Sequence, residues 1–466
     1  MKIIIAGYNV DTSFLKDIKE GKIITPETIS AAYARISRSA KSIPELREIA
    51  ISEVEKARNS NKTIIFDMGH SSIAEHAVFN MDILGISRFL AEFIEKSRLA
   101  SFTEKSQRYV TLKGDFVIPK EIEDNKLGKQ FFDLIREQNE LYKKLYERLK
   151  EINREKFPTL KKRDLEGRSK EDARYVLALA TETQIGMTIN ARSLARLLKR
   201  LDALDLIEAK MLKKLIEDKV KKIAPSIIRY TDADNFERNY KEKLPKMDFE
   251  PIKESVKLVD FKEYGDDFIL ASLLFEKYGY DFEDILQKVR ALSQLKKNEI
   301  FDDIFSDMKP YDVVPRAFET IDYLFQLKIS ASCFAQLKRH RMASVIRSYH
   351  NKDAEFVLPL SFLETGLLNE VNDVMRQTSE LFFKLRKENE LLANYVLTNA
   401  HTVNVLFKMN LRELYHFARL RCDKHSQWEI REIARKMVKE VKRVTPIAAK
   451  CLMGKDEFIT RRSEKV

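Results

Sequence analysis

The chain has 466 residues, of which 44% are hydrophobic and 33% charged, a balance typical of a soluble globular protein with two or three domains. With only 12 Gly and 11 Pro, the composition excludes long disordered or low-complexity segments. The net charge of +12 favours an anionic partner, although a surface rich in Lys and Glu is also typical of thermophilic proteins.

The chain begins MKIIIAGYNVDTSF, with a short apolar run that ends at Asn9 and Asp11. The run is too short for the core of a signal peptide or for a membrane span, so we predict a first strand in a cytoplasmic protein that does not enter the membrane. The three cysteines, Cys333, Cys422 and Cys451, lack CxxC spacing. We therefore expect them to be reduced, and we predict no metal site.

Alternating apolar residues at 77–83 and 320–327 predict two strands. The segments 128–153 and 361–393 instead have helical spacing. In the first of these, five apolar residues lie near one helical face: Phe131, Leu134, Leu141, Leu145 and Ile152. The expected fold class is therefore α+β, with antiparallel sheets and several long helices.

Similar segments recur in the same order along the chain. TINARSL at 188–194 pairs with KMNLREL at 408–414, and ARYVL at 173–177 pairs with ANYVL at 393–397, both at an offset of 220 residues. RLAS at 98–101 pairs with RMAS at 341–344 at an offset of 243. Because the order is kept and the offset drifts slowly, we predict a tandem duplication. The first repeat is 1–232, the second is 256–466, and a charged, Pro-containing linker spans 233–255.

Polar motifs are divided between the repeats. The second repeat carries Arg339-His340-Arg341, with Ser344 three residues later. It also has further polar residues at defined spacings, namely Gln336 upstream and Asn410, Arg412, His416, Arg421 and His425 downstream. The first repeat carries a different set, namely Gly69, His70, Ser72, Glu75, Glu104, Ser106, Gln107, Arg108, Tyr109 and Arg174.

Taken together, these motifs resemble those of the flavin-dependent thymidylate synthases, whose signature is RHRxxS. The resemblance covers nearly the whole chain, twice. It implies conversion of dUMP to dTMP, with FAD carrying the hydride, methylenetetrahydrofolate giving the carbon and NADPH as reductant. It also implies a homotetramer in which different subunits contribute to each active site.

Each repeat departs from the family where the other conforms. The first repeat has Lys96-Ser97-Arg98 in place of Arg-His-Arg, and Leu201 and Asp205 in place of the late Arg and His. In the second repeat, the Glu-x-Ser-x-Arg-Tyr positions hold Arg347, Tyr349, Asn351 and Lys352, and Asn394 stands in place of Arg174. Since the losses are largely reciprocal, we predict one composite site. A homodimer of this chain would then imitate the tetramer. The sequence leaves open whether the half-sets meet within one chain or between two.

By resemblance, Arg421 is the catalytic residue, since a permanent cation near the uracil stabilises the anion that develops there. Guanidinium groups and a hydroxyl also suit the phosphate. The dUMP-binding set implied by the resemblance is Glu104, Ser106, Gln107, Arg108, Arg174, Gln336, Arg339 and Arg421. The cofactor-binding set is His70, Ser72, Glu104, Arg339, His340, Arg341, Asn410, Arg412, His416 and His425. We expect Arg421 and His425 to face the same way, as i and i+4 on one helix.

Two alternatives to an active synthase remain. The first is a catalytically inactive homologue that binds flavin or nucleotide, and the second is a nucleic-acid binder that uses its positive charge. The second alternative ranks last, because no aromatic platforms or glycine-rich clamps are interleaved with the basic residues. Asn190 and Arg192 repeat the later Asn-x-Arg pair in the first repeat, so a structural role for such a pair also stays open.

Overall fold

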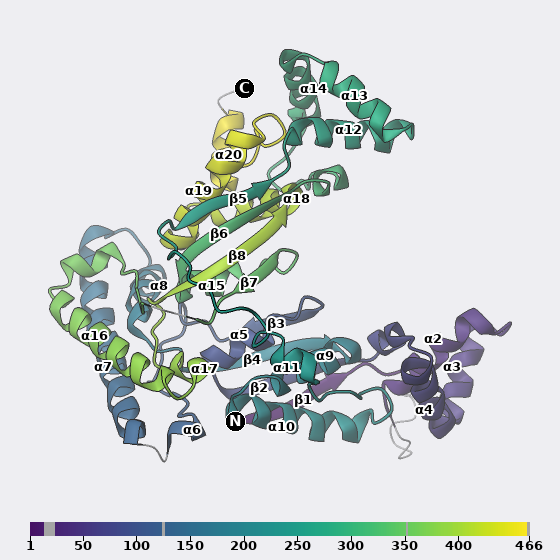
Figure 1. The fold of residues 1–466 in the computed structure, drawn as a ribbon, viewed down its shortest axis with the longest axis horizontal. Coiled ribbons are helices and arrows are strands. Elements are labelled where there is room, and N and C mark those ends of the chain that lie inside the picture. The colour runs from purple at the N-terminus through teal and green to yellow at the C-terminus, as the bar shows by residue number, and fades with distance from the viewer. Residues whose placement is uncertain (14–23, 124–125, 351–352, 464–466) are drawn as a thin grey trace. The chain divides into compact units, whose positions relative to one another are not determined.

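A computed structural model describes residues 1–13, 24–123, 126–350 and 353–463. The chain divides into two compact units (Figure 1). Unit 1 comprises 1–248 and 359–399, and unit 2 comprises 249–358 and 400–466. The segment 359–399, which lies in the second repeat by sequence, therefore packs with the first.

Unit 1 contains a four-stranded antiparallel sheet with the strand order β1-β2-β4-β3. Along β4 the side chains alternate between exposed and buried, so only one face of the sheet meets the core. Gly85 has a φ of +69° where the register of β2 shifts, a conformation that glycine adopts without steric cost. The strands are β1 Lys2–Tyr8, β2 Val78–Ser87, β3 Ala100–Glu104 and β4 Glu182–Asn190.

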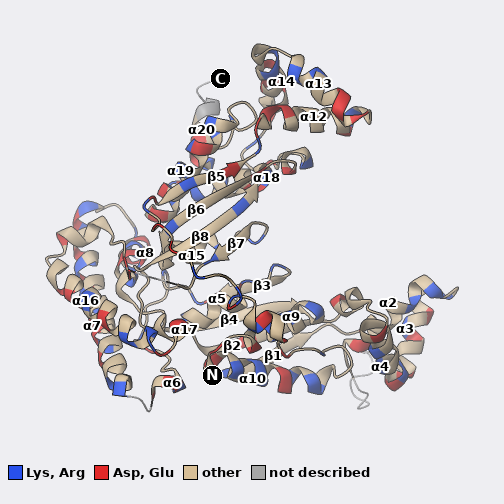
Figure 2. Cartoon of the chain, viewed as in Figure 1, with Lys and Arg blue, Asp and Glu red and all other residues tan. Residues whose placement is uncertain are grey.

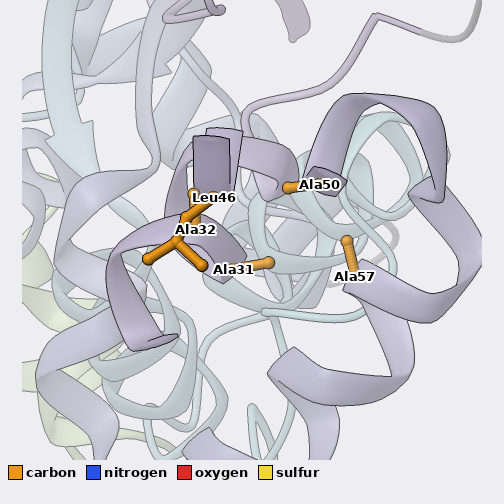
Figure 3. Close-up of a cluster of buried hydrophobic side chains, with 5 residues drawn as sticks. All are labelled: Ala31, Ala32, Leu46, Ala50 and Ala57. Carbon is orange, nitrogen blue, oxygen red and sulfur yellow. The ribbon is translucent and has the colours of Figure 1, made fainter. Parts of the chain in front are cut away.

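Helices α9 and α10 cover the buried face of this sheet, since α9 packs on β4 and α10 on β1. A separate group of helices, α2 to α4, packs around small side chains, and Figure 3 shows its core of Ala31, Ala32, Leu46, Ala50 and Ala57. The bounds of the helices in this part of unit 1 are α2 Glu27–Arg35, η2 Ile36–Arg38, α3 Ile43–Ser52, α4 Val54–Lys62, η3 Thr63–Asp67, η4 Ser71–His76, α5 Arg88–Ile94, α9 Ala191–Asp202 and α10 Ile207–Ile223.

The long helix α7 packs against α16 of the second repeat. Gln138 joins them, because its Nε2 donates to Thr378 Oγ1 at 2.8 Å and to the carbonyl of Val396 at 3.3 Å. Basic and acidic residues are interspersed along both helices, so neither carries a charge of one sign (Figure 2). The remaining helices of this region are α6 Lys120–Glu123, α7 Lys126–Lys156, α8 Lys162–Ala173, η5 Arg174–Val176, η7 Leu360–Glu364, α16 Leu368–Arg386 and α17 Glu390–Ala393.

Two equivalent segments of the repeats pair with each other inside unit 1. Leu179 N donates to Leu397 O at 2.7 Å, and Asn399 N donates to Leu177 O at 2.9 Å. Ala178 and Thr398, which are equivalent positions at the 220-residue offset, face each other in an antiparallel bridge. Pairing of a segment with its own copy is the arrangement of a two-fold symmetric dimer contact, here contained in one chain.

Unit 2 repeats the sheet of unit 1, with the order β5-β6-β8-β7. Helices α18 and α19 pack on it, as α9 and α10 do in unit 1. The strands are β5 Val256–Phe261, β6 Asp322–Ser330, β7 Ser344–Arg347 and β8 Thr402–Asn410. The helices are α12 Gly265–Tyr278, α13 Phe282–Ala291, α14 Gln294–Ser306, η6 Arg316–Glu319, α15 Ala331–Leu337, α18 Leu411–Arg421, α19 Trp428–Val444 and α20 Lys455–Ser463.

A buried carboxylate holds the same strand end in each unit. Glu208 accepts from the backbone and hydroxyl of Ser87, both at 2.7 Å. Glu429 accepts from the same two groups of Ser330, at 2.8 and 2.5 Å. Both serines also cap the following helix. Two such units confirm the predicted α+β class and the two predicted strands, and α7 contains the helix predicted at 128–153.

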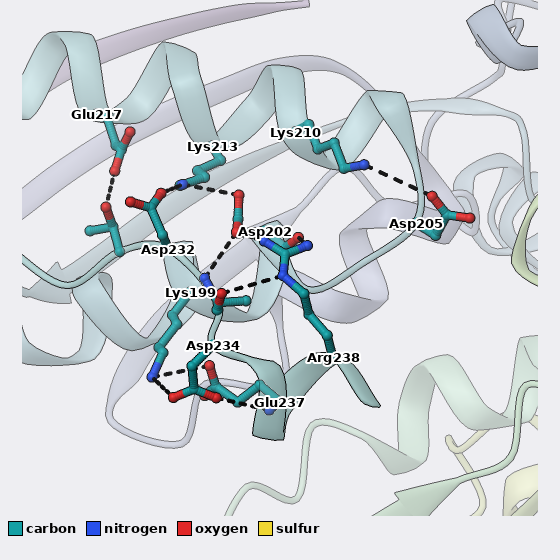
Figure 4. A network of polar contacts seen from close by, with 12 residues as sticks. Lys199, Asp202, Asp205, Lys210, Lys213, Glu217, Asp232, Asp234, Glu237 and Arg238 are labelled. Carbon is teal, nitrogen blue, oxygen red and sulfur yellow. Dashed lines mark hydrogen bonds and ion pairs between the residues drawn. The ribbon is translucent and has the colours of Figure 1, made fainter. Parts of the chain in front are cut away.

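The beginning of the predicted linker is ordered by ion pairs (Figure 4). Asp234 caps α11, Asn235–Asn239, and pairs with Lys199 at 3.0 Å. Lys213 pairs with Asp202 at 3.0 Å and also with Asp232. These ion pairs hold residues 232–238 against α9 and α10. The repeat boundaries at 232 and 256 remain a prediction about the duplication. Within the described ranges, no helix is long and apolar enough to cross a membrane.

Candidate active site

The first candidate half-site lies in unit 1, where β3 ends at Glu104. Arg88, the first residue of α5, donates from Nη1 to Glu104 Oε1 at 3.1 Å, and both side chains are buried. Thr183 Oγ1 donates to the same oxygen at 3.2 Å. Asn399 accepts from Arg88 Nε at 3.0 Å. This pairing compensates the buried charges of Arg88 and Glu104 and fixes the orientation of both side chains.

The loop after β3 brings Gln107 and Arg108 to Arg174, which lies in η5. Arg108 forms an ion pair with Glu171, and Arg174 Nε donates to the carbonyl of Glu171 at 3.2 Å. Burial raises the pKa of Glu171, while the guanidinium of Arg108 opposes this shift. Burial also lowers the pKa of Arg174. Ser106 Oγ accepts from the backbone of Arg108 at 3.2 Å, so this serine shapes the loop.

Two buried donors in this cluster have no acceptor among the described residues. They are Nη2 of Arg174 and Nε2 of Gln107, on side chains that are 7% and 5% exposed. A buried donor without an acceptor costs about 1–3 kcal/mol, so native proteins rarely keep one without a use. Two of them in one cluster are typical of a site that receives an oxygen-rich ligand.

The remaining predicted residues of unit 1 are His70, the N-cap residue of η4, and Ser72 within η4, and both are exposed. His70 Nε2 is 3.3 Å from Arg38 Nη2. In the described part of the chain, no hydrogen bond or ion pair joins either residue to the Glu104 cluster. The structure thus brings Glu104, Gln107, Arg108 and Arg174 together and leaves His70 and Ser72 apart from them.

The second candidate half-site lies in unit 2 around His340, which is 4% exposed. Arg421 Nε donates to His340 Nε2 at 2.9 Å, and His340 Nδ1 lies 3.4 Å from Glu413 Oε1. Because an arginine Nε only donates, Nε2 of the imidazole accepts, and Nδ1 carries the proton. Burial lowers the pKa of His340, against the opposing effect of Glu413, so the neutral ring is favoured.

Gln336 and Arg421 also meet in unit 2, because Arg421 Nη2 donates to the carbonyl of Gln336 at 3.3 Å. Gln336 Nε2 donates to Gln427, the N-cap residue of α19, at 3.3 Å.

The prediction that Arg421 and His425 share one helix is wrong. Helix α18 ends at Arg421, and His425 lies in the following turn, where its amide bonds to Asp423 at 2.9 Å.

A cavity of about 530 Å³ adjoins this half-site in unit 2, and three predicted cofactor residues line it: Asn410, Arg412 and His416. Asn410 caps α18, and Arg412 pairs with Glu319 at 2.7 Å. In unit 1, Asn190 likewise caps α9, and Arg192 pairs with Glu75. The Asn-x-Arg pair therefore has the same structural role in both units, whatever it binds.

Two residues of the second repeat that differ from the family motif, Arg347 and Asn394, make structural contacts. Arg347, at the position of Glu104, is buried against the rings of Phe334 and Tyr349, with its guanidinium carbon 5.0 and 4.6 Å from their centroids. Asn394, at the position of Arg174, donates to Glu390 O at 2.8 Å. Asn351 and Lys352 lie outside the described residues. Neither Arg347 nor Asn394 retains the chemical groups of its counterpart in unit 1.

Sequence reasoning missed Arg88, Asn399 and Glu413. The sequence contained a signal for Arg88: it directly follows the strand end, and its equivalent at the 243-residue offset is Ala331. The signal for Asn399 was the apolar Leu179 at its equivalent position. Both differences follow the reciprocal pattern of the other site residues.

Comparisons with known proteins agree with these observations. A family model described as thymidylate synthase complementing protein matches residues 22–226 and 279–447. A UPF0159 protein of Thermoplasma acidophilum is 25% identical over 472 residues, covering 90% of this chain and 93% of its own length. A flavin-dependent thymidylate synthase of Clostridium tetani is 31% identical over 212 residues, 44% of this chain and 82% of its own length. One of Sulfolobus acidocaldarius is 40% identical over 134 residues, 27% of this chain and 51% of its own length.

Proposed function

Because the chain belongs to the thymidylate synthase complementing protein family, we propose that it is a flavin-dependent thymidylate synthase with a composite active site. In this proposal the first repeat supplies the Glu104 to Arg174 half-set, and the second repeat supplies Gln336, Arg339 to Arg341 and Arg421. The protein converts dUMP to dTMP with methylenetetrahydrofolate and NADPH. It works as a homodimer that imitates a tetramer of single-repeat enzymes.

The observation that carries the proposal is the pair of buried donors on Arg174 and Gln107. A nucleotide monophosphate has the acceptors that these groups lack, and a guanidinium binds phosphate by charge-assisted hydrogen bonds. Arg108 adds a further cation, since its ion pair with Glu171 leaves its side chain 30% exposed. The second repeat has lost Arg174 and Arg108, so it lacks the chemical groups for a similar site of its own.

The residues of unit 2 fit a flavin cofactor. The cavity beside α18 is within the range of volumes that ligand sites have. Arg412, Arg419 and Lys455 line it, and Nε of Arg419 is buried without an acceptor among the described residues. These cations suit a pyrophosphate, and Asn410, Arg412 and His416 would hold the cofactor. When bound, FAD supplies the hydride chemistry.

The role of Arg421 follows from its contacts. The neutral His340 accepts from its Nε and the carbonyl of Gln336 accepts from its Nη2, so the guanidinium is held in one orientation. A positioned permanent cation stabilises the negative charge that develops on a uracil ring when its C5 becomes nucleophilic. Gln336, which is tied to Gln427, is held beside it.

The test is release of tritium from [5-³H]dUMP by the purified protein with FAD, NADPH and methylenetetrahydrofolate. Arg108→Ala and Arg339→Ala each remove one cation from a different half-set. Arg148→Ala serves as the control, because among the described residues Arg148 pairs with its helix neighbour Glu151 alone. We expect the first two variants to lose activity and the control to keep it. Recovery of activity on mixing Arg108→Ala with Arg339→Ala would place the site between two chains. A wild type that holds flavin but releases no tritium would instead be a silent binder.

A further inference from the structure

Asn399 lies at the centre of the unit 1 half-site and is fully buried. Its Oδ1 accepts from Arg88 Nε at 3.0 Å. Its Nδ2 donates to Gln107 Oε1 at 3.0 Å and to the backbone carbonyl of Arg174 at 2.9 Å. One amide thus links three residues that come from different elements of the first repeat.

Asn399 itself belongs to the second repeat. It follows α17 and pairs with the first repeat, because its backbone amide donates to Leu177 at 2.9 Å. Its counterpart in the first repeat is Leu179, which is 1% exposed and has no polar side-chain group. The counterparts of Arg88 and Arg174 in the second repeat are Ala331 and Asn394. Of the two equivalent positions, 179 and 399, the polar residue is therefore at 399, the one that contacts Arg88 and Arg174.

We propose that Asn399 is a positioning residue through which the second repeat orients the nucleotide-binding groups of the first. This inference rests on the proposed function, since it assigns a nucleotide monophosphate to the half-site. Because Asn399 Nδ2 occupies Gln107 Oε1, the amide of Gln107 is fixed with its Nε2 as the group left to donate. The bond to the carbonyl of Arg174 fixes the backbone from which that guanidinium extends.

Leucine at 399 would reproduce the residue of the other repeat and remove all three side-chain hydrogen bonds. The side-chain amide of Gln107 can then rotate, and Arg88 loses one of the two buried acceptors that it has in the described part of the chain. A hydrogen bond to a charged ligand that is lost or misaligned raises a dissociation constant by roughly 10- to 100-fold. We therefore expect Asn399→Leu to raise the dissociation constant for dUMP by about 10- to 100-fold.

The matched control is Gln138→Leu. It breaks a buried polar link between α7 and the same second-repeat segment, and the described hydrogen bonds of Gln138 go to Thr378 and Val396, not to residues of the half-site. Both variants should lower the temperature of unfolding. Only Asn399→Leu should weaken dUMP binding, measured by equilibrium dialysis on the full chain supplied with FAD. Asn399→Asp keeps the acceptor for Arg88 but sets a carboxylate oxygen against Gln107 Oε1 and the carbonyl of Arg174, so it should weaken dUMP binding at least as much as Asn399→Leu.

Hydrogen exchange without nucleotide separates this inference from the proposed function. If Asn399 positions the half-site, amides in 104–108 and 174–177 exchange faster in Asn399→Leu than in Gln138→Leu, whichever ligand the site takes. Equal exchange in the two variants would overturn the positioning role, as would equal dUMP affinities in variants that bind it. A wild type that binds no dUMP, with exchange as expected, would overturn only the proposed substrate.

Discussion

Replacement of Glu208 by alanine tests how strongly the second-repeat segment is built into unit 1. Glu208 accepts from the backbone and hydroxyl of Ser87 and from the hydroxyl of Tyr395, which belongs to the second repeat. All three residues are buried. The hydroxyl of Ser87 also accepts from the amide of Leu90, but that bond does not use the hydroxyl proton. The substitution therefore removes the acceptor of three buried donors, Ser87 N–H, Ser87 O–H and Tyr395 O–H.

Each such donor costs about 1–3 kcal/mol, so Glu208→Ala should lower the free energy of unfolding by about 3–9 kcal/mol. Urea unfolding at constant pH measures this value. In a Tyr395→Phe background one of the three donors is already absent, so the loss should shrink by about 1–3 kcal/mol. Equal losses in both backgrounds would refute the reasoning, since the bond between the repeats would then contribute nothing.

Glu208→Gln tests the direction in which the stability of the chain changes with pH. Burial raises the pKa of Glu208, so protonation of this carboxylate is more favourable in the folded chain than in the unfolded chain. The stability that this protonation contributes is present below the pKa of the unfolded chain and is lost as the pH rises through the folded pKa. Wild type should therefore lose stability relative to Glu208→Gln as the pH rises. A constant difference across the range would contradict the assigned shift.

Three further outcomes are expected. Arg174→Met should weaken dUMP binding at least about 10-fold in dialysis while keeping or raising the unfolding temperature, because a buried cation with an unused donor is removed. Burial lowers the pKa of His340, so the free energy of unfolding should decrease as the pH falls below about 6.5, the ordinary pKa of a histidine. In His340→Gln the free energy of unfolding, measured with urea, should depend less on pH in this range. Arg412→Ala should reduce the bound flavin seen by absorbance, whereas Arg192→Ala, which breaks the equivalent ion pair in unit 1, should leave it unchanged.

The sequence by itself determined the fold class, the family and the division of motifs between two repeats. Alternation at 77–83 and 320–327 and helical spacing at 128–153 located elements that the structure contains, because these periods report which side of an element is buried. The repeated segments also located both Asn-x-Arg pairs at helix starts, where an Asn side chain caps the helix.

Only the tertiary structure decided what those buried faces pack against. Hydrophobic attraction has no direction, so the period of α16 does not reveal that it packs with the first repeat. Spacing likewise suggested one helix for Arg421 and His425, although α18 ends at Arg421. The role of Asn399 depends on hydrogen bonds to residues that are 225 to 311 positions away in sequence. Contacts at such separations depend on the packing of whole segments, and a local pattern does not contain that information.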